Sequence, residues 1–366
     1  MPGFDFEGFP IFDGKTKELI GVRYTSDATA TVWFDDGMKA LQADVDRRRS
    51  GMVNLIDLAE CGCSRWALVT SYSDRQAAQF LLYDLETKQL EPVGAARPTL
   101  DARRMATRDF ERIKTRDGLA MPMYVTKPAG KGPWPMVVLV HGGPYLRGGR
   151  WGWDADSQFL ASRGYLVVEP EFRGSTGYGN AWFRAGWKQW GLAMQDDVAD
   201  ATRWAVAQGL ADPKRVCIAG ASYGGYATLM GLIRDPDLYR CGVAWVAVTY
   251  INLMYDLAWS DFSEVYKQYG MPVLIGDQVK DAAQLEATSP LKQAARITQP
   301  LLLAYGGADR RVPVRHGLRF RDAVRKTNSQ VEWQEYPDEG HGWYKPENRY
   351  DFWSRVETFL AKQLAP

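Results

Sequence analysis

This sequence has few cysteines, no long apolar run and no marked excess of positive or negative charge. Its 366 residues include four cysteines, which are too few for a disulfide scaffold of this length. Nowhere do about 18 apolar residues follow one another, and the opening MPGFDFEGFP lacks the basic and apolar regions of a secretion signal. We therefore expect a cytoplasmic chain with reduced cysteines and no membrane partner.

The charges are balanced. Lys and Arg number 45 against 44 Asp and Glu, so nothing favours binding to nucleic acid or to an anionic membrane. Cys61 and Cys63 are separated by one glycine, but no histidine or further cysteine lies close in sequence to complete a tetrahedral metal site. We interpret this pair as part of a strand or turn, and we expect neither a metal nor another cofactor.

From about residue 106 onward, short apolar runs alternate with helical patterns. PMVVLVHGGP, GYLVVEPEFRG, RVCIAGASYGG, CGVAWVAV and QPLLLAYGGAD are typical of strands buried on both faces, while MQDDVADATRWAVAQG has the apolar spacing of a helix. Strands that alternate with helices predict a mainly parallel sheet covered on both faces, an α/β fold. Ligands bind beyond the carboxyl ends of such strands.

Before residue 106 the pattern changes to short alternating runs such as ELIGVRYTSD, ATVWFDDG, RWALVTSYSD and QFLLYDLETKQLEPV. This pattern predicts a small all-β segment over residues 1–105, followed by a catalytic domain over residues 106–366. The alternative is that these strands extend the edge of the main sheet. No low-complexity linker marks the boundary.

The segment GASYGG places Ser222 between an apolar strand and a helical pattern, in the order of the G-x-S-x-G nucleophile turn. Gly220 and Gly224 suit this turn because the backbone there leaves no room for a Cβ atom. The Tyr223 N–H, at the start of the helix, and the Gly143 N–H, in the loop HGGP, are the candidate donors of an oxyanion hole.

A serine needs a base, and the chain has only three histidines. His341 lies in the loop DEGHGW after a predicted strand, and we interpret it as the base. His316 falls in a helical pattern, which favours a surface or capping role, and His141 precedes two glycines. Asp309 follows a buried strand and would orient the imidazole, which gives the α/β-hydrolase order Ser, Asp, His.

Several segments in this order, VLVHGGP, FRGSTGYG, GWKQWG, DDVADA, GASYGGY, GGADRRVP and DEGHGW, resemble the catalytic domain of the prolyl oligopeptidase family. The resemblance covers about residues 106–366 and is nearest to the acylaminoacyl-peptidase branch. It implies an α/β-hydrolase fold and a serine hydrolase of peptides or acyl-amino acids, with Ser222, Asp309 and His341 as the triad. It also implies that Arg311 holds a substrate carbonyl. Where the family often has NYRGS this chain has EFRGS, with Glu171 in the first position.

Members of that family normally carry a complete seven-bladed propeller, whereas residues 1–105 resemble only about two blades. So few blades cannot close a propeller, so we expect either a fragment of a longer protein or blades that have become a small accessory domain. The uncovered strands predict a homodimer through the N-terminal segment, with packing against the hydrolase domain as the alternative. An open site would also accept bulky esters or longer peptides.

Three functions therefore remain to be separated: a peptidase or acyl-aminoacyl hydrolase, a carboxylesterase acting through the same triad, and a binding module without catalysis. The expected substrate is a peptide or small ester. The aromatic segment YINLMYDLAWSDF follows a predicted strand end near Ser222. Tyr250, Trp259 and Phe262 are therefore candidates for the substrate pocket.

Overall fold

The computed structural model describes residues 3–256 and 260–365. Its largest element is an eight-stranded sheet in the order β15-β14-β13-β12-β10-β11-β9-β8. Strands β10 to β15 pair in parallel, while β8 and β9 are antiparallel to their neighbours. The strands are β8 (Thr107–Lys114), β9 (Ala120–Lys127), β10 (Trp134–Val140), β11 (Leu166–Pro170), β12 (Ala211–Ala221), β13 (Cys241–Trp245), β14 (Leu301–Gly306) and β15 (Val331–Tyr336).

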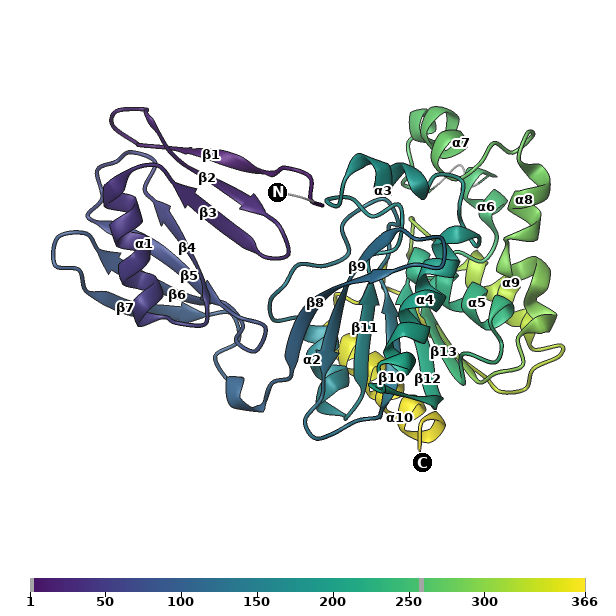
Figure 1. Cartoon of the computed structure of the whole chain (residues 1–366). Coiled ribbons are helices and arrows are strands. Elements are labelled where there is room, and N and C mark those ends of the chain that lie inside the picture. Colours follow the sequence, from purple (N-terminus) through teal and green to yellow (C-terminus); the bar gives the residue numbers. More distant parts are fainter. Residues whose placement is uncertain (1–2, 257–259, 366) are drawn as a thin grey trace.

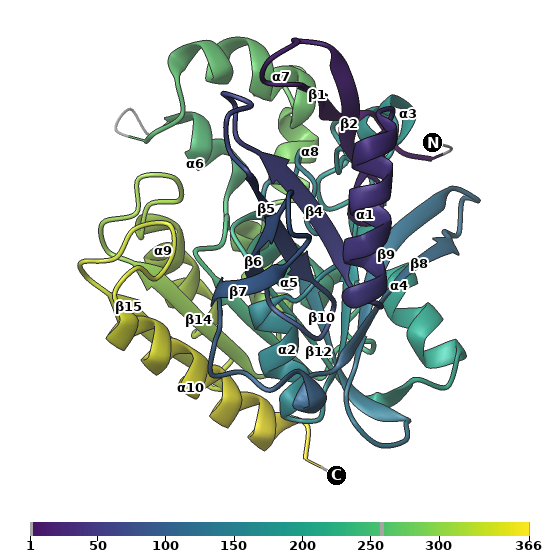
Figure 2. The same ribbon diagram turned by 90° about the vertical axis from the view of Figure 1, so that its left-hand side faces the viewer.

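Helices cover both faces of this sheet (Figures 1 and 2). Alternate residues of each strand point to opposite faces, so the run MVVLV supplies two separate cores. Met136 and Val138 pack with α4 (Ala193–Ala207), α5 (Tyr223–Arg234) and α9 (Arg315–Val324), whereas Val137 packs with α2 (Ala155–Ser162) and α10 (Pro346–Gln363). This arrangement confirms the predicted α/β-hydrolase fold.

Further helices are short and lie in the connections between these elements. They are η1 (Ala102–Arg104), α3 (Asn180–Ala185), α6 (Ile251–Asp256), the π-helix η2 (Tyr266–Gly270), α7 (Met271–Leu274), α8 (Ala282–Ala287) and the 3₁₀ helix η3 (Pro290–Arg296).

The N-terminal segment forms two antiparallel meanders with a core of their own. One contains β1 (Glu7–Phe12), β2 (Leu19–Thr25) and β3 (Thr29–Trp33), and the other β4 (Val53–Leu58), β5 (Trp66–Tyr72), β6 (Gln79–Asp84) and β7 (Leu90–Ala95). Figure 1 shows this segment beside the hydrolase sheet and not in it. The structure therefore rejects the alternative that these strands extend the main sheet.

One helix, α1 (Asp36–Arg48), interrupts the strands that the sequence pattern predicts. The Asp35 carboxylate caps it by accepting a hydrogen bond from the Met38 N–H at 2.8 Å. Met38, Leu41 and Val45 follow helical spacing and are buried. The signal for this helix was thus present, in a segment whose flanks alternate like strands.

The N-terminal segment also contacts the hydrolase domain through the first residues that the structure describes. The Asp5 N–H donates to the Gly177 carbonyl at 3.0 Å, and the Asp5 carboxylate accepts from the Gly179 N–H at 3.0 Å. Figure 1 accordingly shows the segment that leads into β1 close to α3.

A second contact comes from the turn between β2 and β3. The Arg147 guanidinium donates to the Ser26 carbonyl, and the Trp151 N–H donates to the Asp27 carbonyl at 2.8 Å. Residues 147–151 follow the HGGP loop. The turn between β2 and β3 therefore lies against a segment that leads directly from the C-terminal edge of the sheet.

The four cysteines form two pairs, Cys61 with Cys63 and Cys217 with Cys241. Cys217 and Cys241 are register partners on the adjacent strands β12 and β13. These pairings differ from the reduced cysteines expected from their low number, because cysteine count says nothing about which strands become neighbours.

Candidate active site

Ser222 lies on the sharp turn between β12 and α5, with φ +60° and ψ −119°. A side chain on Gly220 or Gly224 would collide with the Val140 carbonyl of the neighbouring strand. The sequence forms this turn because only glycine leaves space there. The turn presents Ser222 at the C-terminal edge of the sheet.

Asp309 and His341 meet at the same edge. The His341 Nδ1 lies 2.8 Å from the Asp309 Oδ2, and the Asp309 side chain is fully buried. The other carboxylate oxygen accepts from the backbone N–H groups of Arg311 at 2.7 Å and Val312 at 2.9 Å. These bonds fix the carboxylate so that it can hold the imidazole in one orientation.

Ser222 and His341 line one cavity of about 370 Å³. Tyr223 and Gly143 also line it, so the structure brings the predicted nucleophile, base and oxyanion residues together. The remaining wall includes apolar residues that the sequence analysis did not name individually: Leu146, Trp190, Val246, Val248 and Met254. Trp190 ends the aromatic segment AWFRAGWKQW, a candidate for the pocket lining, although bulky aromatic residues more often belong to a core.

The two candidate oxyanion donors occupy suitable backbone positions. Tyr223 is the first residue of α5, so its N–H precedes the first intrahelical hydrogen bond. Gly143 has φ +114°, a conformation that favours glycine. A Cβ on the preceding Gly142 would lie 3.3 Å from the Ser222 Cβ, which shows how closely the HGGP loop approaches the serine.

Arg311 lines the cavity and is held by two neighbours. Its Nε donates to the Asp261 carboxylate at 2.5 Å, and its guanidinium lies 4.9 Å from the centre of the Phe262 ring. Phe262 also lines the cavity. The two residues therefore lie together beside Ser222.

We expected Tyr250 to line the substrate pocket, but its side chain points elsewhere. Its hydroxyl donates to Glu286 on α8 at 2.5 Å, and it is not among the residues that line the cavity. Its backbone does follow a strand end, but the side chain turns toward α8. Trp259 lies outside the described residues.

The two other histidines do not contact Asp309 in the described structure, although His141 also lines the cavity. His316 is only 1% exposed, which contradicts the expected surface position, and its Nδ1 accepts from the Thr249 N–H at 3.2 Å. Burial, with the nearby charge of Arg319, lowers the pKa of His316 to about 3. His141 stacks on Phe172 with 4.3 Å between ring centres, and burial lowers its pKa to about 4.

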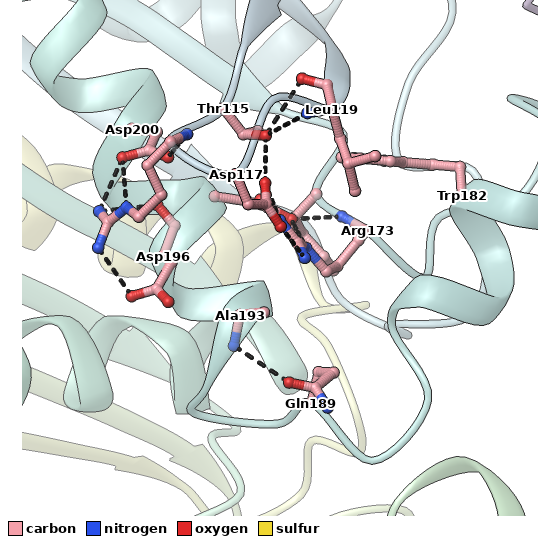
Figure 3. Close-up of polar contacts among 12 residues, drawn as sticks. Thr115, Asp117, Leu119, Arg173, Trp182, Gln189, Ala193, Asp196 and Asp200 are labelled. Carbon is pink, nitrogen blue, oxygen red and sulfur yellow. Dashed lines mark hydrogen bonds and ion pairs between the residues drawn. The ribbon is translucent and has the colours of Figure 1, made fainter.

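A buried ion-pair network supports the segment FRGS next to the site (Figure 3). Arg173 donates to Asp197 of α4 through Nε and NH2, at 2.8 and 2.7 Å, and to Asp117 at 2.8 Å. The following Ser175 Oγ lies 3.1 Å from the His141 Nε2. Arg173 thus joins the turn between β8 and β9, the start of α4 and the loop beneath His141.

The described residues contain neither a candidate metal site nor a membrane-spanning helix. Across residues 3–256 and 260–365, no three His, Cys, Asp or Glu side chains are grouped so that they could hold a metal ion. Within the same ranges, no helix is both long enough and apolar enough to cross a bilayer.

Among solved structures, the chain resembles a puromycin-hydrolyzing peptidase from Mycobacterium tuberculosis, with 26% identity and a TM-score of 0.73. The alignment covers 82% of this chain and 47% of that one. The similarity therefore includes strands on both sides of residue 106.

Curated relatives are similar over most of this chain. Dipeptidyl aminopeptidase BIII of Pseudoxanthomonas mexicana is 37% identical over 81% of this chain and 44% of its own length. Dipeptidyl peptidase family member 6 of Caenorhabditis elegans is 32% identical over 89% and 47%. Acylamino-acid-releasing enzymes of rice, Arabidopsis, mouse and human match at 24 to 28% identity.

The chain spans about half the length of these two dipeptidyl peptidase relatives. The profile of one protein family matches residues 151–366, which contain Ser222, Asp309 and His341. Together with the nucleophile turn and the hydrolase sheet, this match shows that the chain belongs to the prolyl oligopeptidase family.

Proposed function

We propose that this protein is a serine peptidase that cleaves peptide or acyl-amino-acid bonds through an acyl-enzyme on Ser222. The observation that carries the proposal is the 2.8 Å contact between His341 and the buried Asp309, with His341 and Ser222 lining one cavity. The names of its relatives, dipeptidyl aminopeptidase and acylamino-acid-releasing enzyme, support this class of substrate.

In the proposed reaction, the His341 Nε2 removes the hydroxyl proton of Ser222 as its oxygen attacks the substrate carbonyl carbon. The N–H groups of Tyr223 and Gly143 stabilise the negative charge that develops on the carbonyl oxygen. The C–N bond then breaks, and His341 gives its proton to the leaving amine. A water molecule, activated in the same way, hydrolyses the ester on Ser222.

Arg311 would bind the carbonyl of the residue before the one that is cleaved. It is suited to this role because its guanidinium is always charged and is held at the cavity wall by Asp261. The apolar wall that includes Trp190 and Met254 would accept the side chain next to the cleaved bond.

The test combines labelling and turnover. A fluorophosphonate should label the wild-type protein and not Ser222→Ala, and Ser222→Ala and His341→Ala should each lose several orders of magnitude in kcat. His316→Ala is the matched histidine control and should keep catalysis in any folded fraction, since it lies outside the cavity. Labelling that persists in Ser222→Ala, or activity that persists in His341→Ala, would overturn the triad.

Comparing an acyl-amino-acid anilide and a dipeptide anilide with a p-nitrophenyl ester separates peptidase from carboxylesterase. We expect both anilides to be cleaved, because the relatives act on amide bonds according to their names. Cleavage of the ester alone would replace the proposal with the carboxylesterase. The cytoplasmic location expected from the sequence remains part of the proposal, to be tested by cell fractionation.

A further inference from the structure

Glu171, the first residue of EFRGS, is a buried carboxylate that the proposed reaction does not use. It follows β11 at the catalytic edge of the sheet and is 2% exposed. Its two oxygens accept hydrogen bonds from the backbone N–H groups of Gly148, at 2.9 Å, and Gly149, at 2.6 Å. Both glycines end the loop that begins at His141.

This loop, residues 141–149, carries the candidate oxyanion donor Gly143. Its two arms lie against each other, because a Cβ on Gly148 would overlap the His141 ring. The His141 Nε2 is itself 3.7 Å from the Glu171 carboxylate. Glu171 therefore lies where both arms of the loop converge.

The groups around Glu171 have opposing effects on the pKa of its carboxyl. Burial raises the pKa of Glu171 to about 7, while the N–H groups of Gly148 and Gly149 and the nearby charges of Arg147 and Arg108 oppose that rise. A carboxylate offers acceptors to two donors at once, whereas an amide of the same shape has one acceptor and one NH₂ group. Each glycine N–H group thus has its own acceptor in one of the two oxygens of this side chain.

We propose that Glu171 is a positioning residue for the oxyanion hole: it clamps the Gly148–Gly149 end of the loop and so fixes the Gly143 N–H relative to Ser222. The inference rests on the proposed function and adds to it a residue outside the triad. The clamp acts on the transition state more than on the bound substrate, because the negative charge on the carbonyl oxygen develops only in the reaction.

Glu171→Gln is the test variant, since it keeps the size of the side chain but sets an NH₂ group against one glycine N–H. We expect kcat on an acyl-amino-acid anilide to fall about ten- to a hundredfold, because a misplaced catalytic group can cost about a hundredfold, and KM to change less than about threefold. Affinity for a peptidyl trifluoromethyl ketone, whose hemiketal oxygen would occupy the hole, should fall by a factor similar to the fall in kcat/KM.

Glu169→Gln is the matched control. Glu169 lies two residues earlier, is also largely buried, and pairs with Arg108 at 2.9 Å and not with the loop. Its replacement should lower the melting temperature without the selective loss of kcat and ketone affinity.

A kcat for Glu171→Gln within about twofold of wild type, or a loss no larger than that of Glu169→Gln, would overturn the inference. If Glu171→Gln does not fold, Glu171→Asp replaces it, because the shorter acid cannot reach both glycines and should show the same kcat loss. Failure of both to fold would also overturn it, since Glu171 would then be needed for folding. Absence of wild-type turnover in the same assay would instead contradict the proposed function.

Discussion

At the scale of single residues, Arg311 should separate substrate classes. Its guanidinium would bind a carbonyl that an acyl-amino-acid or peptide presents and a short alkyl ester lacks. One charge-assisted hydrogen bond contributes about 1.5–3 kcal/mol, so Arg311→Ala should lower kcat/KM on peptide-like substrates by about 10- to 150-fold. The loss on a short ester should be much smaller.

Steady-state kinetics on both substrates measure this difference. Arg310→Ala is the control, because Arg310 is exposed and is not among the residues that line the cavity. Equal losses on both substrate classes for Arg311→Ala would rule out the carbonyl-binding role.

His316 gives a prediction about stability and pH. Because burial lowers its pKa from 6.5 to about 3, the unfolded chain binds a proton between these values that the folded protein does not. The folded state should therefore lose up to about 1.4 kcal/mol per pH unit as pH falls below 6.5, down to about pH 3. His316→Asn keeps an acceptor for the Thr249 N–H without this proton.

Chemical denaturation of wild type and His316→Asn between pH 7.5 and 5 is the measurement. The free energy of unfolding of the wild type should decline relative to that of the variant as the pH falls. A constant difference between the two proteins over this range would mean that His316 does not titrate as its burial requires.

The sequence predicted which residues lie together at the C-terminal edge of the sheet better than it predicted their surroundings. Ser222, Asp309 and His341 each follow a predicted strand, and local motifs with glycine identify their turns. His316 and Tyr250 lie in equally clear local patterns, yet their side chains turn toward Thr249 and Glu286, respectively. Such directions depend on packing between distant segments, which a local pattern does not contain.

At the scale of elements, the Arg173 network should hold α4 to the turn between β8 and β9. Arg173 is 5% exposed, and its removal would leave Asp197 buried without a cation. Losing one partner of a buried pair typically costs about 3–5 kcal/mol. Arg173→Met should therefore lower the melting temperature by about 4–7 °C.

Calorimetry tests this, with Arg116→Met as the control. Arg116 pairs with Asp196 and Asp200, which are labelled in Figure 3, but its side chain is 44% exposed. Exposed pairs contribute about 0–1 kcal/mol, so this variant should melt near the wild-type temperature. Equal shifts for both variants would show that burial does not distinguish the two networks.

Elements of the N-terminal segment show where sequence patterns are ambiguous. The alternating runs RWALVTSYSD and QFLLYDLETKQLEPV were predicted to be strands, and β5 and β6 within them pair antiparallel. Helix α1 was missed because its apolar residues are few and short strands precede and follow it. Its Asp35 cap and its spacing of Met38, Leu41 and Val45 were the signals that could have identified it.

At the scale of the whole molecule, the N-terminal strands keep apolar side chains in solvent. Phe9 is 54% exposed, Phe12 54% and Val32 46%, so packing against the hydrolase domain does not cover them. We propose that a second copy of this surface does, which gives a symmetric dimer.

Light scattering at micromolar concentration should then give about twice the mass of one chain, and Phe9→Ser combined with Val32→Ser should return it to one. Val279→Ser is the control, because the Val279 side chain is 86% exposed. Leu146 is also exposed but lines the cavity, so it is not a suitable control. A wild-type monomer at every concentration would reject the dimer.

The turn between β2 and β3 also has a consequence for protein engineering. Its Ser26 carbonyl binds Arg147, two residues after Tyr145 in the loop that carries Gly143. Chimeras that join this hydrolase domain to the N-terminal part of a relative would replace that turn and remove one of the acceptors of Arg147. The two parts are therefore not freely interchangeable, and a functional chimera must include a turn that matches Arg147.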